Sequence, residues 1–356
     1  MPDVQEVFRM TTREIAPEPG ALERQHVRQR RSVRNRKMSA LAVAAVIIAA
    51  IALFAAAAIN RAKEGSAPAT VAPKGPGTAF TVVGLDGSVR SSFRAAAGAA
   101  TPDLSPDGTM VAFAIADRTI PQIATMRVDG SGFRVLTNDP IAAEAPRWSP
   151  DGSQILYFRV DTDGKLRLMV MNADGTNVRE IAGTHQTASF NPPDWSPDGS
   201  LALYTSFKDG VPILATLPMT GGRTHFLNTG SGWPEVGGAW SPDGRSIAFT
   251  RGTGVVNGVL VFEVWVMNAD GSGEHRLAAL SGASAEAPAW SPDGSKVAFI
   301  GTEGGIYRGN GTLYVVDVAT GDITEVLRGT ATGRRHENRP NWLPSGDGLL
   351  VMTETR

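Results

Sequence analysis

Acidic and amide side chains recur along this chain, each a few residues before a tryptophan: Glu144, Asn191, Glu235, Glu286 and Glu337. If the fold brings them together, a ring of carboxylates could bind a cation or a basic peptide, and His185 and His336 stand in neighbouring segments. Alternatively, the acids cap turns or pair with nearby arginines such as Arg147 and Arg339. We favour this structural interpretation and keep the ring as the candidate ligand site.

The other chemically active residues form no catalytic motif. The five histidines show no HExxH spacing, and neither a GxSxG elbow nor a GxxxxGK[ST] phosphate loop occurs. Residues 161–164, Asp-Thr-Asp-Gly, resemble part of a calcium loop, but no glutamate follows at the ligand distance, which favours a hairpin turn. Cysteine is absent, which excludes disulfides and thiol chemistry. The sequence therefore predicts no catalytic residue, no metal site and no cofactor.

A repeated tetrapeptide indicates the elements that position these residues. Ser-Pro-Asp-Gly begins at Ser105, Ser149, Ser196, Ser241 and Ser291, and a degenerate copy occupies residues 343–346. The intervals of about 44 to 50 residues match one four-stranded propeller blade. Proline fixes the first corner of the turn, aspartate can accept a backbone hydrogen bond, and glycine adopts the left-handed conformation. Apolar alternation after each turn predicts strands with one buried face.

A second turn recurs some 20 to 30 residues after the first, as in Asn-Ala-Asp-Gly at residues 172–175 and 268–271. Each repeat therefore contains four antiparallel strands. Residues 80–94 match only the third and fourth strands, whereas the residues from 341 onward match only the first and second. The predicted fold is an all-β, six-bladed β-propeller whose last blade takes two strands from each end of the domain, because such closure removes exposed sheet edges.

Each intact repeat also has an aspartate within its turn, and most have a tryptophan just before it. We assign these residues to the turn and to blade packing rather than to a sugar-binding row: Trp148, Asp151, Trp195, Asp198, Trp240, Asp243, Trp290 and Asp293.

The segment before the repeats reads as a membrane anchor. Residues 38–60 carry no charge, and a helix of that length spans a hydrocarbon core of about 30 Å. Arginine and lysine without acidic residues at 24–37 predict a cytoplasmic tail at 1–37. Residues 61–79 read as a flexible linker to an extracytoplasmic propeller at 80–356, anchored in the plasma (inner) membrane. A cleaved signal peptide is the alternative.

The recurring Trp-Ser-Pro-Asp-Gly, its apolar strand and the later Met-Asn-Ala-Asp-Gly resemble the repeat of the TolB-like propeller family (PD40, a WD40-like repeat) over residues 80–356. The resemblance implies a six-bladed propeller outside the inner membrane that serves as a binding platform. Similar repeats form the non-catalytic propeller of prolyl-oligopeptidase-type peptidases. This chain departs from TolB itself, which is soluble and carries an α/β domain before the propeller, so TolB's own role is not implied.

The two kinds of turn share one face of the predicted propeller, and variable loops share the other. Binding usually resides in variable loops on a rigid scaffold. The longest of these loops are expected at residues 251–259 and 301–311, both rich in glycine. Loops between blades contain His185, His225, Trp233 and His336.

Three functions remain open. The favoured one is a non-enzymatic module that binds an envelope protein or peptide. The second is a transmembrane signalling protein that couples the propeller to a cytoplasmic regulator through residues 1–37, and the third is a metal-dependent hydrolase or lyase. A net charge of −1 argues against a nucleic-acid partner.

Overall fold

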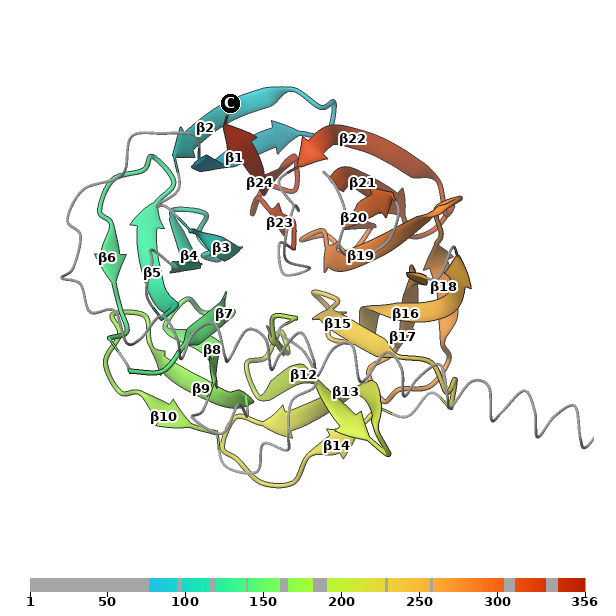
Figure 1. Cartoon of the computed structure of the whole chain (residues 1–356), viewed down its shortest axis with the longest axis horizontal. Coiled ribbons are helices and arrows are strands. Elements are labelled where there is room, and N and C mark those ends of the chain that lie inside the picture. The colour runs from blue at the N-terminus through green and yellow to red at the C-terminus, as the bar shows by residue number, and fades with distance from the viewer. Residues whose placement is uncertain are drawn as a thin grey trace, which may run out of the picture.

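The computed structural model describes residues 77–94, 98–115, 120–138, 140–160, 166–181, 191–227, 230–256, 259–303, 311–330 and 339–355. These residues form a closed ring of six antiparallel blades around a central axis (Figure 1), which confirms the predicted propeller. Within these ranges no helix has the length and apolar character needed to cross a membrane. The predicted tail, membrane span and most of the linker lie outside the described residues.

The first three blades each have four strands, numbered outward from the axis. Blade 1 comprises β3 (Ala100–Leu104), β4 (Met110–Ile115), β5 (Gln122–Arg127) and β6 (Arg134–Val135). Blade 2 comprises β7 (Ala143–Trp148), β8 (Gln154–Val160), β9 (Leu166–Asn172) and β10 (Arg179–Glu180). Blade 3 comprises β11 (Asp194–Trp195), β12 (Leu201–Lys208), β13 (Val211–Pro218) and β14 (His225–Phe226).

The next two blades repeat this order. Blade 4 comprises β15 (Glu235–Trp240), β16 (Ser246–Val256), β17 (Val259–Asn268) and β18 (His275–Ala278). Blade 5 comprises β19 (Ala283–Trp290), β20 (Lys296–Glu303), β21 (Gly311–Asp317) and β22 (Ile323–Thr330).

Blade 6 closes the ring with strands from both ends of the domain, as predicted. Its inner strands are β23 (Asn341–Trp342) and β24 (Gly348–Thr355), and its outer strands are β1 (Gly77–Gly84) and β2 (Val89–Arg94). Strands β1 and β24 pair along their full lengths, from Gly77 opposite Thr355 to Gly84 opposite Gly348. Because β1 begins at Gly77, the last three residues of the expected linker belong to the blade.

The apolar core lies between blades rather than within one layer. Six clusters of buried side chains are described, and each joins residues of two neighbouring blades. Every blade is therefore covered on both sides, and consecutive residues such as Val111, Ala112 and Phe113 are all fully buried. The prediction of strands with one buried face is wrong for this reason: continuous apolar runs are typical of sheets covered on both faces.

The predicted glycine-rich loop at residues 251–259 is also different in the structure. Strand β16 extends to Val256 and β17 begins at Val259, so most of this segment is a long β-hairpin. A register shift between Gly252 and Gly254 accommodates the glycines as a bulge. Residues 304–310 of the corresponding segment in blade 5 lie outside the described residues.

Each Ser-Pro-Asp-Gly turn is closed by its own aspartate and serine. In blade 2, Asp151 Oδ1 accepts hydrogen bonds from Ser149 Oγ at 2.6 Å and from the backbone N–H of Ser153 at 3.0 Å. The Ser149 hydroxyl oxygen in turn accepts the N–H of Gln154 at 2.9 Å, where β8 begins. Gly152 takes the left-handed conformation with φ of 71°. The same contacts recur around Asp107, Asp198, Asp243 and Asp293.

These hydrogen bonds make the turns sensitive to acid, because they lower the pKa of the aspartate in each one. The Ser149 hydroxyl, with further donors from Ser153, lowers the pKa of Asp151 to about 2, and Ser291 and Ser295 do the same for Asp293. A carboxylate whose folded pKa lies below its unfolded value stabilises the fold above the unfolded pKa, and this stabilisation is lost as the pH falls through the folded pKa. The relevant window is therefore between about pH 4 and pH 2.

We expect the double variant Asp151→Asn, Asp293→Asn to lose less stability than the wild type as the pH is lowered through this window, because these two turns no longer contain an ionisable group. Urea denaturation at a series of pH values measures the slope. The variant Ser149→Ala, Ser291→Ala keeps both carboxylates but removes their first donors, so its slope should be intermediate. Identical slopes in all three proteins would contradict this assignment.

Candidate functional site

The innermost strands carry a repeated distortion that directs side chains toward the axis. In blades 1, 2, 4 and 5 the strand registers shift there. The residue at the shift has a positive φ between 51° and 65°: Thr101, Ala145, Gly237 and Ala287. Such bulges change the direction of the side chains that follow. In these four blades the bulge lies two residues before the position that we call the axial position. In every blade, the axial position is the residue directly before the tryptophan, or before Leu104 in blade 1: Asp103, Arg147, Asp194, Ala239, Ala289 and Asn341.

Neighbouring blades are joined at the axial position by one of two hydrogen bonds. In the first, the axial side chain of one blade accepts a hydrogen bond from the backbone N–H of the next blade's tryptophan, or of Leu104 where the next blade is blade 1. Asp103 Oδ2 accepts from Trp148 N at 2.7 Å, and Asp194 Oδ2 accepts from Trp240 N at 2.8 Å. Asn341 Oδ1 accepts from Leu104 N at 3.3 Å, across the interface where the ring closes.

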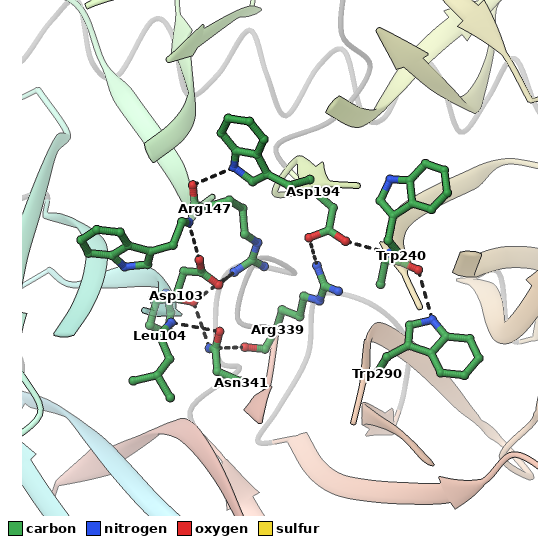
Figure 2. Close-up of polar contacts among 12 residues, drawn as sticks. Asp103, Leu104, Arg147, Asp194, Trp240, Trp290, Arg339 and Asn341 are labelled. Carbon is green, nitrogen blue, oxygen red and sulfur yellow. Dashed lines mark hydrogen bonds and ion pairs between the residues drawn. The ribbon is translucent and has the colours of Figure 1, made fainter. Parts of the chain in front are cut away.

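In the second, the indole N–H of the next blade's tryptophan donates to the axial carbonyl oxygen. Trp195 Nε1 donates to Arg147 O at 3.2 Å, and Trp290 Nε1 donates to Ala239 O at 3.2 Å. Trp342 Nε1 donates to Ala289 O at 2.9 Å. Together the two forms occupy all six interfaces between blades (Figure 2 shows most of them).

The two forms are alternatives. Where an aspartate occupies the preceding axial position, the indole N–H is not used: Nε1 of Trp148 and of Trp240 is buried and has no hydrogen-bond partner among the described residues. Blade 1 has Leu104 in place of a tryptophan, so its interface with blade 6 depends on the side chain of Asn341. Asn341 Nδ2 also donates to Pro102 O at 3.0 Å.

Two ion pairs lie within the circle of innermost strands, and we call their four members the axial charge cluster. Arg147 Nη1 lies 2.6 Å from Asp103 Oδ1, and Arg339 Nη1 lies 3.1 Å from Asp194 Oδ1. Figure 2 shows the guanidinium groups of Arg147, from strand β7, and of Arg339, from just before β23, reaching toward the middle of the ring. The Arg147 side chain is only 3% exposed.

Burial dominates the electrostatics of the Asp103–Arg147 pair. It raises the pKa of Asp103, against the opposing effect of Arg147, and it lowers the pKa of Arg147, against that of Asp103. An arginine keeps its charge even so, because its unperturbed pKa is far above neutrality. The innermost strands therefore hold a permanent charge in a place largely removed from water.

The predicted acidic row is buried rather than open to the axis. Glu144, Glu235 and Glu286 are 1%, 2% and 7% exposed. Glu235 Oε1 lies 2.9 Å from Arg251 Nη2, and the Arg251 guanidinium stacks over the Trp265 ring at 4.2 Å. Glu286 accepts a hydrogen bond from Thr302 Oγ1 at 3.2 Å.

The other predicted ligand residues are placed less fully. Asn191 is partly buried, and its side chain lies beside Gly237. His185, His336 and Glu337 lie outside the described residues. Among the residues that are described, no three His, Asp or Glu side chains lie close enough together to hold one metal ion. Within the described part of the row, Glu235 pairs with Arg251, whereas Arg147 and Arg339 pair with the aspartates Asp103 and Asp194.

The axial charge cluster is the part of the site that the sequence reasoning missed. Arg147 and Arg339 were considered only as partners of glutamates, and Asp103 and Asp194 were not considered. A signal was present, because all four lie within three residues of a repeated landmark, the tryptophan or Leu104 before the turn. Charged residues there interrupt an otherwise apolar and proline-rich strand in blades 1, 2 and 3.

These features define a six-bladed β-propeller of four-stranded repeats with a charged group of residues at its axis. Residues 78–264, just over half of the chain, match the family model described as the TolB beta propeller domain. The chain belongs to this family, whose fold is consistent with a protein-binding module.

Individual relatives are distant. The structure of a putative TolB from Agrobacterium tumefaciens is similar with a TM-score of 0.64 at 19% identity, covering 79% of this chain and 99% of that one, which shows the fold alone. Dipeptidyl-peptidase 5 of Porphyromonas endodontalis is 32% identical over 84 residues, 22% of this chain and 12% of that protein. An uncharacterized protein of Agrobacterium fabrum is 30% identical over 145 residues, 41% of this chain and 46% of that protein. The chain thus matches less than half the length of these two relatives.

The two forms of inter-blade hydrogen bond can be told apart with a matched pair of variants. Trp342 and Trp240 are 8% and 9% exposed, but only Trp342 uses its indole N–H. We expect Trp342→Phe to lower the free energy of unfolding by about 1–2 kcal/mol more than Trp240→Phe, since the former loses a bond and the latter loses an unsatisfied donor. Urea denaturation gives both values, and equal losses would contradict the two-form scheme.

Proposed function

We propose that this chain is a membrane-anchored, extracytoplasmic β-propeller that binds a protein or peptide at its axis and loop face without catalysing a reaction. Residues 38–60 would hold it in the plasma membrane with the N-terminus in the cytoplasm, as their uncharged composition and the preceding basic residues suggest.

The observation that carries the proposal is the axial charge cluster. The repeat supplies an internal comparison, because blades 4 and 5 have Ala239 and Ala289 at the axial position and still make their inter-blade hydrogen bonds. Charge is therefore not required there by the blade. Buried ion pairs contribute little net stability compared with apolar side chains, since desolvation offsets their attraction. A recognition role accounts for the arginine charges, since the two axial aspartates already serve as inter-blade acceptors.

The pairing of the acids supports binding over metal-dependent chemistry. Asp103, Asp194 and Glu235 each form an ion pair with an arginine. Carboxylates engaged in this way offer few free oxygen ligands to a cation. Alternating positive and negative groups at fixed positions instead match the polar groups of a peptide or protein segment.

Partner capture tests the role of the cluster. We expect the variant Asp194→Asn, Arg339→Gln to lose most crosslinked partner in living cells, because it removes an axial ion pair while an amide oxygen remains to accept the Trp240 N–H. The matched control is Glu263→Gln, Arg276→Gln, which removes an ion pair of the two outer strands of blade 4 with the same change in charge. Capture is quantified at equal protein amounts after the thermal unfolding temperatures have been compared.

Retention of partner by the axial variant, or equal loss in both variants, would overturn this assignment. If partner capture falls only in proportion to a lower unfolding temperature, the variant has lost folded protein rather than a binding site. In that case Arg339→Lys, which keeps the positive charge, should capture no more partner than the axial variant. Under the proposal, Arg339→Lys retains part of the capture.

Fractionation tests the anchor. We expect the full-length protein to stay in the membrane pellet after alkaline carbonate washing, because an apolar helix of this length is held by the hydrocarbon core. External protease should reach the propeller in spheroplasts. Release of the protein by carbonate, or a mature N-terminus beyond residue 60, would support the cleaved signal peptide instead.

A further inference from the structure

One edge of the Arg147 guanidinium is buried without a partner. Its Nη1 is engaged by Asp103 Oδ1 at 2.6 Å and by Pro102 O at 3.4 Å. Its Nε and Nη2, which form the other edge, have no hydrogen-bond acceptor among the described residues. This arginine therefore uses only part of its donor capacity, although its side chain is 3% exposed.

An unused edge of this kind is energetically unfavourable. A buried donor left without an acceptor destabilises the fold, and more so when the group is charged. Arginine cannot relieve the cost by releasing its proton near neutral pH. An acceptor that binds at this edge would therefore recover energy that the protein alone does not.

The shape of the edge indicates which acceptor fits. Nε–H and Nη2–H point in parallel, the arrangement that holds both oxygens of a carboxylate. A phosphate dianion would bring two negative charges beside Asp103 and Asp194, whereas a carboxylate brings one. Arg339, whose positive charge acts on Arg147, stands on the other side of the cluster and favours an added anion between them (Figure 2).

Blades 4 and 5, which do not adjoin blade 2, carry no long side chain at the axial position. Blades 4 and 5 place alanines at the axial position, and an alanine side chain ends at Cβ. Charge and hydrogen-bonding capacity are thus concentrated on blades 1, 2, 3 and 6.

We propose that the axis binds a carboxylate group, held by the Nε and Nη2 edge of Arg147, and that this group belongs to the captured protein or peptide, as a chain terminus or an acidic side chain. The inference deepens the proposed function and rests on it for the kind of ligand.

Sodium formate is the first probe, with sodium chloride as control at the same ionic strength. At about ten times its Kd, formate should raise the Tm of the full-length protein by about 3 °C relative to chloride. Formate should also shift the Nε–H resonance of Arg147 in nitrogen-15 spectra, which reports on the edge itself. Equal effects of both salts, or no shift of that resonance, would show that water alone occupies the site and would overturn the proposal.

Two variants separate the edge from the charge. Arg147→Lys keeps the positive charge beside Asp103 but lacks the paired donors, so the formate-specific rise in Tm should disappear. Arg251→Lys changes the second arginine that is buried in the described part of the chain, whose Nε donates to Glu235 Oε1 at 3.1 Å, and should leave the formate effect unchanged. If Arg147→Lys does not fold, the resonance shift in the wild type decides the question.

Peptide probes identify the source of the carboxylate. N-acetyl-trialanine with a free terminus, its amide, and N-acetyl-Ala-Glu-Ala-amide are compared by the same resonance shift. A response to the free acid alone assigns a chain terminus, and a response to the glutamate peptide assigns a side chain. Formate binding without partner capture would defeat the proposed function alone, whereas capture without any carboxylate response would defeat this inference alone.

Discussion

The ring depends on one hydrogen bond between the innermost strands at each blade interface. The chain makes this bond in two chemical forms, with an axial side chain as acceptor or with an indole as donor. Either form suffices, so the axial residue is free to change wherever the next blade has a tryptophan. The closing interface lacks that freedom, because Leu104 has no polar group and Asn341 must provide the acceptor.

This freedom explains how a charged cluster coexists with a regular fold. Apolar burial between blades supplies the general stabilisation, and it comes from six clusters that do not include the axial charges. The side chains of Arg147 and Arg339 reach other blades, where they pair with Asp103 and Asp194, but they form neither of the two inter-blade hydrogen bonds described above. The axis can therefore acquire polar groups without loss of the blade architecture.

Much of the fold could be predicted from the sequence because short sequence motifs that recur in every blade determine it. The Ser-Pro-Asp-Gly turn specifies its own hydrogen bonds, and its spacing specifies the blade. The axial cluster could not be predicted in the same way, since Asp103 and Arg147 are 44 positions apart and meet only when a bulge turns both side chains inward. Burial on both faces was missed because the packing of whole blades, not the strand pattern, determines it.

The composition of blade 6 has a consequence for the order of events during synthesis. Strands β1 and β2 precede every other described strand in the chain, yet β1 pairs along its full length with β24, which follows all of them. Until β24 leaves the ribosome, β1 has one unpaired edge and blade 5 has no neighbour on one side. Until β24 has been made, the nascent propeller therefore exposes an unpaired strand edge and an uncovered blade face, both of which favour aggregation. Its ring can close only after that.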